Sequence, residues 1–198
     1  MASLADSLLQ QIMAAQSSTE TSALSADGTS VQNGLAAAIP ALITALSRNA
    51  QSKDGAEALD AAIAKDHDGS VIDNIGTYLQ NPNLDDGNGI LKHALGGQQE
   101  SVQQGLSAQT GLDPQMIAKL LQMAAPLVLG MLAKQKQQQG LNADGLSDLL
   151  QQERAEQSQK NPDLMGMLTG MLDQDKDGGF MDDVQSMAGK LFGRRNNE

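Results

Sequence analysis

Aspartates near the C-terminus have the spacing of ligands for a hard cation. Asp173, Asp175 and Asp177 alternate along the chain and are followed by a glycine. In a tight loop, alternate residues can direct their carboxylates to one side, and hard cations prefer oxygen ligands. Gly179 would add a backbone carbonyl, and Asp182 would close a short loop. The sequence therefore predicts a Ca²⁺ or Mg²⁺ site at these five residues.

The loop departs from a standard calcium loop in one respect. An EF-hand requires a bidentate glutamate at its twelfth position, where this chain has Val184. The missing ligand lowers the expected calcium affinity to a Kd of about 10⁻⁴–10⁻³ M. The alternative is an acidic turn that begins a helix, because Asp182 and Asp183 would suit the positive end of the helix dipole. Both interpretations stay open on the sequence alone.

The composition of the chain argues against several classes of function. The formal net charge is −11, which repels phosphate backbones, and Arg194 and Arg195 form too small a basic patch to offset it. No nucleic-acid partner is expected. The chain has no cysteine, which excludes disulfides and thiolate zinc sites. No nucleophile–base pair or complete cofactor motif is visible, so we expect no enzyme.

Two further features bear on localisation. The first residues carry no basic segment followed by a long apolar stretch, so no secretory signal is predicted and the expected localisation is cytoplasmic. The longest apolar run, residues 120–133, is interrupted by Gln122, Pro126 and Gly130. It is shorter than the ~20 residues that a membrane span needs, so no span is expected.

The elements that must position the loop are predicted to be helices. Of the 198 residues, 40% are hydrophobic and only 2% aromatic, so Leu, Ala, Ile and Met must fill the core. These residues mostly favour helices. A first helix begins near Leu4, where Ser3 and Asp6 resemble a capping box. A long helix begins with Asp113 as N-cap and Pro114 at its first position, and ends near Gly140. The fold class is therefore all-α.

An internal repeat organises the chain. Leu-Ser-Ala, an apolar helix with a central proline, an Asp-Gly helix start and an acidic loop recur in the same order. The paired features are Leu24 and Leu106, Pro40 and Pro126, Asp54 and Asp144, and residues 66–75 and 175–184. We divide the chain into an N-terminal helix and loop (1–22), repeat 1 (23–105) and repeat 2 (106–198). The two repeats are expected to form one domain around a pseudo-two-fold axis.

Two functions are compatible with these features. The first is a non-enzymatic structural or interaction protein linked to a divalent cation. The second is a metal-independent helical module, which would hold a partner helix or an apolar ligand in a Met/Leu-rich groove between the repeats. An unidentified protein partner and a homo-oligomer are both compatible with the sequence.

Several segments together resemble a known family. These are residues 89–96, 110–113, 120–130 and 173–184, followed by Leu191, Phe192 and Gly193. In combination they resemble the bacterial YidB-like family, a domain of unknown function, over roughly residues 24–193. The resemblance implies a multihelical fold and a bacterial source. It implies no activity and no catalytic residues.

Overall fold

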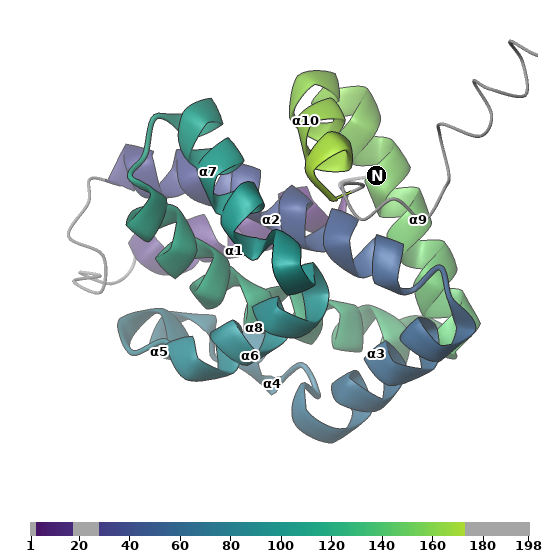
Figure 1. Ribbon diagram of the computed structural model, residues 1–198. Helices are drawn as coiled ribbons and strands as arrows, with labels where there is room; N and C mark the ends of the chain where they lie inside the picture. The colour runs from purple at the N-terminus through teal and green to yellow at the C-terminus, as the bar shows by residue number, and fades with distance from the viewer. Residues whose placement is uncertain (1–2, 18–27, 173–198) are drawn as a thin grey trace, which may run out of the picture.

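The computed structural model describes residues 3–17 and 28–172, and these residues are almost entirely helical with no strand (Figure 1). The all-α prediction is confirmed at this level. In chain order the elements are α1 (Leu4–Ser17), α2 (Gly28–Asn49), α3 (Lys53–Asp66), α4 (Ser70–Asp73), α5 (Ile75–Gln80), α6 (Leu84–Leu95), the 3₁₀ turn η1 (Gly96–Gln98), α7 (Gln99–Thr110), α8 (Pro114–Gln139), α9 (Ala143–Lys160) and α10 (Pro162–Leu172).

The long helices α2 and α8 form the centre of the fold. They pack on each other and carry the two internal prolines, Pro40 and Pro126. The side chain of Leu120 fills the space beside Gly34, where a Cβ atom would lie 2.2 Å from its Cδ1. Almost every residue in the middle of both helices is buried. Leu, Ala and Ile therefore supply the core, as the composition predicts.

The predicted boundaries of α8 are confirmed. Asp113 is the N-cap, and its Oδ1 accepts a hydrogen bond from the backbone N–H of Gln115 at 2.8 Å. Pro114 follows as the first helical residue, where its missing N–H costs nothing. Gly140 ends the helix in the left-handed conformation, with φ of 64°. Local signals thus place both ends of the main core helix.

The other helices surround this central pair (Figure 1). Helix α1 packs on α2, α5 and α8, and buries Leu4, Leu8 and Ile12. Helix α7 packs on α8, α2 and α10, whereas α3 and α9 pack on each other and on the central helices. Helix α6 lies along α8. Because α1 contributes to the same core, it is part of the compact fold.

Length and apolarity alone would allow α2 and α8 to cross a membrane. In the structure, however, 72% of the apolar window of α2 and 78% of that of α8 are buried within the protein. A core helix of a soluble protein passes the same test. The burial therefore accounts for the apolar character of both helices.

Candidate functional site

The predicted cation ligands Asp173, Asp175, Asp177, Gly179 and Asp182 all lie outside the described residues. The structure instead describes the helix that leads to them. Helix α10 ends at Leu172, which is 3% exposed. The residue before it, Met171, packs so closely on α7 that a Cβ atom at Gly105 would lie 2.2 Å from its Cε. The acidic segment therefore follows, in the sequence, a firmly packed part of α10.

The described part of α10 carries no basic side chain over its last turn. The next residue along the chain is Asp173. The acidic segment therefore follows a part of the chain that has no basic residue of its own to offset the charge of the aspartates.

The acidic turn around Asp68, which the sequence pairs with residues 175–184, lies within the described residues. Asp68 Oδ1 accepts a hydrogen bond from the N–H of Ser70 at 2.9 Å, and this bonding lowers the pKa of the exposed Asp68 carboxyl. Gly69 adopts φ of 93°, which favours glycine. Asp73 forms an ion pair with Lys134 of α8, and Gln137 Nε2 donates to the carbonyl of Asp68 at 2.9 Å. The polar groups of Asp68 and Asp73 in this turn therefore already have hydrogen-bond or ion-pair partners within the protein.

Elsewhere, too, the described residues offer no candidate metal centre. Within residues 3–17 and 28–172, no group of three or more His, Cys, Asp or Glu side chains could hold a metal ion. The acidic turn at Asp68 caps α4 and ties it to α8.

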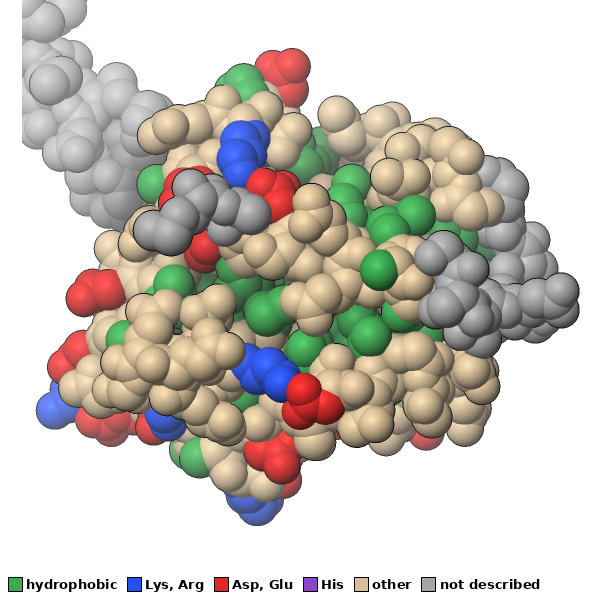
Figure 2. All heavy atoms as spheres, turned by 180° about the vertical axis from the view of Figure 1, so that it is seen from behind, with side chains coloured by type: hydrophobic (Ala, Val, Ile, Leu, Met, Phe, Trp, Pro, Cys, Tyr) green, Lys and Arg blue, Asp and Glu red, His purple; other side chains and the backbone are tan. Residues whose placement is uncertain are grey.

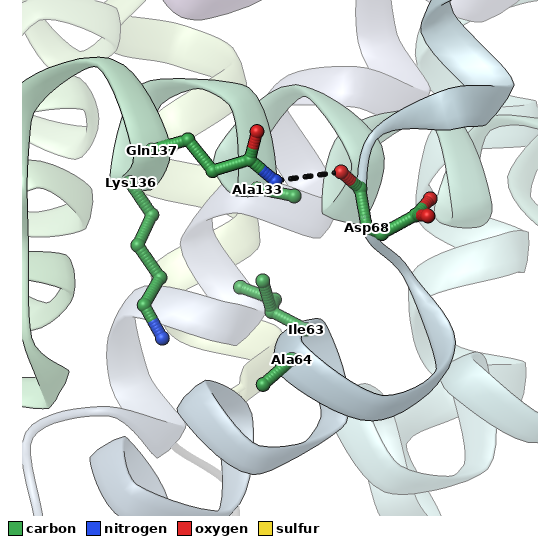
Figure 3. A pocket seen from close by; sticks show the side chains of 6 residues that line it. All are labelled: Ile63, Ala64, Asp68, Ala133, Lys136 and Gln137. Carbon is green, nitrogen blue, oxygen red and sulfur yellow. Dashed lines mark hydrogen bonds between the residues drawn. The ribbon is translucent and has the colours of Figure 1, made fainter.

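A small hollow lies between α3 and α8, beside this turn (Figure 3). Its volume is about 210 Å³, which is below the range of roughly 300–1,000 Å³ typical of ligand pockets. The lining residues are Ile63, Ala64, Asp68, Ala133, Lys136 and Gln137. The ammonium group of Lys136 pairs with Asp60 of α3, and Gln137 is bonded to Asp68. Its polar groups thus have protein partners already.

A buried polar cluster joins the start of α1 to α9. Glu153 is 7% exposed, and its two carboxylate oxygens accept the backbone N–H of Leu4 at 2.9 and 2.8 Å. Gln157, one turn further along α9, donates from Nε2 to Ser3 Oγ at 3.1 Å. Ser3 Oγ also accepts the N–H of Asp6 at 3.2 Å, which is one half of the predicted capping box. Glu153 of α9 therefore caps a further backbone N–H at the start of α1.

The charges around this cluster shift one another's pKa values. Burial raises the pKa of the Glu153 carboxyl above its ordinary value, although N–H groups of Leu4 and Ala5 oppose that shift. The hydrogen bond from Lys160 lowers the pKa of Asp6, and the same contact raises the pKa of Lys160. The N-terminal end of α1 is therefore held by a carboxylate in its interior and an ion pair at its edge.

Sequence reasoning did not identify Glu153 or Gln157. Both lie in a polar stretch of α9, and nothing in that stretch distinguishes them from their exposed neighbours. Their role depends on α1 packing nearby, which no local pattern reports.

The central parts of α2 and α8, where the sequence predicted a Met/Leu-rich groove, are buried. Nearly all residues of α2 from Ala37 to Ser47, and of α8 from Met123 to Ala133, are buried by neighbouring helices. Met165 of α10 covers α2, where Thr44 Oγ1 lies 3.6 Å from its sulfur. In the described part of the chain, these Met and Leu side chains belong to the core.

Comparison with known proteins identifies a family. Residues 6–135 match the family described as bacterial protein of unknown function (DUF937). No curated protein and no solved structure matches the chain. The match is consistent with the resemblance to YidB-like proteins without establishing that name. Because it covers more than half of the sequence, the chain belongs to this DUF937 family of bacterial proteins of unknown function.

Proposed function

We propose that this chain is a non-enzymatic helical protein that acts in structure or protein interaction and binds Ca²⁺ or Mg²⁺ weakly through its acidic loop. The observation that carries the proposal is the junction at Leu172. The packed part of α10 that reaches Leu172 has no basic residue in its last turn, and Asp173, Asp175 and Asp177 follow in the sequence. A cation would relieve the repulsion among these groups.

The expected affinity limits where such a site would be occupied. A Kd of about 10⁻⁴–10⁻³ M leaves the site mostly empty of calcium in a cytoplasm poor in that ion. In the cytoplasmic localisation that we propose, Mg²⁺ is therefore the better candidate. Asp182 would complete the ligand set, and Gly179 would contribute a carbonyl.

The same proposal includes a two-repeat architecture. The contacts between the described helices match if α1, α2 and α3 correspond to α7, α8 and α9, and α4 with α5 corresponds to α10. Thus α1 packs on α2, α8 and α5, and α7 packs on α8, α2 and α10. Likewise α3 and α4 pack on α8, whereas α9 and α10 pack on α2. This reciprocity supports a pseudo-two-fold axis that exchanges the two halves. Gly34 and Leu120 stand six residues before Pro40 and Pro126, respectively, and touch each other, as residues on such an axis would.

The packing supports a different alignment of the acidic loops from the one based on sequence. About the proposed axis, α4 and α5 correspond to α10, and this correspondence would align residues 71–79 with residues 164–172. The apolar positions then agree, as Val71 with Leu164, Ile72 with Met165, Ile75 with Leu168, Tyr78 with Met171, and Leu79 with Leu172. Residues 173–180 consequently align with the short connection after α5, and not with the turn at Asp68.

An interaction role is supported by the surface. Hydrophobic side chains reach the surface across the middle of the rear face (Figure 2). Exposed apolar surface of this kind is common at protein interfaces. The partner would be another protein or a second copy of the chain, because a net charge of −11 disfavours nucleic acid.

Thermal unfolding tests the cation proposal. The melting temperature is measured in chelator, in 10 mM Ca²⁺ and in 10 mM Mg²⁺ (about tenfold above the weaker expected Kd), with isothermal titration as a direct measure of binding. An ion concentration tenfold above the Kd stabilises by about 1.4 kcal/mol, which raises the melting temperature by roughly 3–6 °C. Asp175→Asn should abolish the shift, whereas Asp85→Asn, an exposed aspartate of α6, should keep it. Absence of both heat and shift with either ion would refute the proposal.

A further inference from the structure

Two methionines of α10 hold this helix against α7, which lies beside it (Figure 1). Met167 and Met171 are four residues apart, so they lie on the same face of α10. A Cβ atom at the buried Gly105 of α7 would lie 2.2 Å from Met171 Cε, 2.5 Å from Met171 Sδ and 3.4 Å from Met167 Sδ. Both sulfur atoms therefore border the same glycine of α7, where the contact leaves no room for a further methyl group.

Solvent reaches these two methionines more readily than it reaches the methionines of the core. Met123, Met131 and Met165 are 2%, 5% and 2% exposed, respectively. Met167 and Met171 are only partly buried and pack at the margin of the core. A dissolved oxidant must reach a sulfur atom to modify it. Of the three methionines in α10, the two that contact α7 are therefore the ones open to oxidation.

Hydrogen peroxide and hypochlorous acid convert the thioether of methionine into a sulfoxide by transferring one oxygen atom. The sulfur lone pair attacks that oxygen, so an S–O bond forms while the O–O or O–Cl bond of the oxidant breaks. Sulfur loses two electrons, and the oxidant is reduced to water, or to chloride with release of a proton. Methionine sulfoxide reductases reverse the change with two electrons from a dithiol, which yields a disulfide and water.

A sulfoxide does not suit the contact with Gly105. The added oxygen needs space beside Met171 Sδ, and this sulfur already lies 2.5 Å from the place where a Cβ atom of Gly105 would stand. The sulfoxide is also polar, so it favours water over an apolar contact between two helices. Oxidation therefore favours an arrangement in which the sulfoxides face water and α10 stands away from α7.

We propose that Met167 and Met171 form a reversible oxidation site, and that their oxidation releases α10 from α7. The release is local, because α10 also packs on α9 and on α2, where the sulfur of Met165 contacts Thr44. An oxidant thus changes the surface between α7 and α10 and leaves the central helices α2 and α8 packed. The inference goes beyond the function proposed above and requires no bound cation.

Peptide mapping tests the reactivity of the two sites in the full chain. The folded protein and the protein in denaturing urea are treated with hydrogen peroxide, and tandem mass spectrometry measures the oxidation rate of each methionine. In the folded protein, Met167 and Met171 should oxidise roughly tenfold faster or more than Met123 and Met131, because only the former two are accessible. In urea all four should react at similar rates. Rates in the folded protein as slow as that of Met123 would overturn the assignment.

Thermal unfolding tests the release of α10. Met167→Leu combined with Met171→Leu removes both oxidisable sulfur atoms and nearly keeps the side-chain volume. The matched control combines Met13→Leu with Met116→Leu, two partly buried methionines of α1 and α8. Peroxide should lower the melting temperature of the wild type and of the control by about 5 °C or more, and that of the site variant much less. Each protein is compared with its own reduced form, which removes the effect of the substitutions themselves.

Hydrogen exchange locates the change. After oxidation, amides of residues 164–171 should exchange roughly tenfold faster or more, whereas amides of residues 127–133 in α8 should keep their protection. Met171→Gln, which puts a polar group at the contact without any oxidant, should produce the same local increase. Methionine sulfoxide reductases with a dithiol should restore both the protection and the melting temperature of the oxidised wild type. Equal losses of melting temperature in the site variant and the control, or unchanged exchange in α10 once Met167 and Met171 are oxidised, would disprove the release.

Discussion

Leu4 and Glu153 are 149 residues apart in sequence, and the backbone N–H of Leu4 donates to both carboxylate oxygens of Glu153. This contact supplies the first turn of α1 with a negative charge, which suits the positive end of a helix. It also places a carboxylate in the interior, where ionisation is costly. The start of α1 is therefore held by a group whose protonation should affect stability.

Replacing Glu153 tests this contact, because it should change how the stability of the protein depends on pH. Because burial raises its pKa in the folded state, the folded protein binds the proton more tightly than the unfolded chain. The resulting stabilisation is complete below the ordinary value of 4.5 and is lost as pH rises through the raised pKa. Glu153→Gln removes the ionisable group, and its amide oxygen can still accept the backbone N–H of Leu4. In urea unfolding, wild type should gain stability relative to the variant as pH falls from neutral toward 4.5.

The control for that experiment is Glu156→Gln, which removes the same charge from the same helix. It should leave most of the pH dependence in place. Glu153→Ala, by contrast, leaves the N–H of Leu4 without a partner and should cost about 1–3 kcal/mol at neutral pH. Parallel stability curves for wild type and Glu153→Gln would contradict the assignment.

Two glycines of α6 should respond oppositely to alanine. A Cβ atom at Gly87 would lie 1.8 Å from the carbonyl oxygen of Gln122, and backbone cannot move aside easily. Gly87→Ala should therefore destabilise by about 1–3 kcal/mol. Gly89 has no atom within 4 Å of the same position, so Gly89→Ala should stabilise by up to about 1 kcal/mol through helix propensity. Thermal and urea unfolding measure both, and equal effects would show that α6 does not approach α8 at Gln122.

The contact between α2 and α8 predicts a coupling between two substitutions. Gly34→Ala places a methyl group against the end of the Leu120 side chain and should cost about 1–3 kcal/mol. Leu120→Ala creates a cavity and should cost about 2–5 kcal/mol. In the double variant the new methyl group occupies part of that cavity, so the total should fall short of the sum by about 0.5 kcal/mol or more. Strict additivity in a double-mutant cycle would argue against the contact.

Tyr78 is a direct spectroscopic probe, because it is the single tyrosine and there is no tryptophan. Its hydroxyl donates to the carbonyl of Met123 at 3.1 Å, and burial raises the pKa of Tyr78. The stabilisation is complete below the ordinary value of 10.0 and is lost as pH rises toward the folded pKa. Tyrosinate absorbance should therefore appear together with loss of helical circular dichroism at high pH. Ionisation near pH 10 with the helices intact would contradict this burial.

Local signals predicted a large part of the helical structure. The N-cap at Asp113, the proline after it and Gly140 mark the two ends of α8, because each acts through backbone groups within one turn. Ser3 likewise caps α1. The predicted cation ligands remain predictions, since Asp173 and the residues after it lie outside the described part of the chain.

The sequence by itself determined the helical class, the ends of the main core helix and the family, because these depend on composition, short-range spacing and motif order. Only the tertiary structure decided that Glu153 caps α1, that Gly87 packs against the backbone carbonyl of Gln122, and that the acidic turn at Asp68 is bonded to α8. Each of these contacts joins residues far apart in sequence. Their partners are set by the path of the whole chain, which no local pattern encodes.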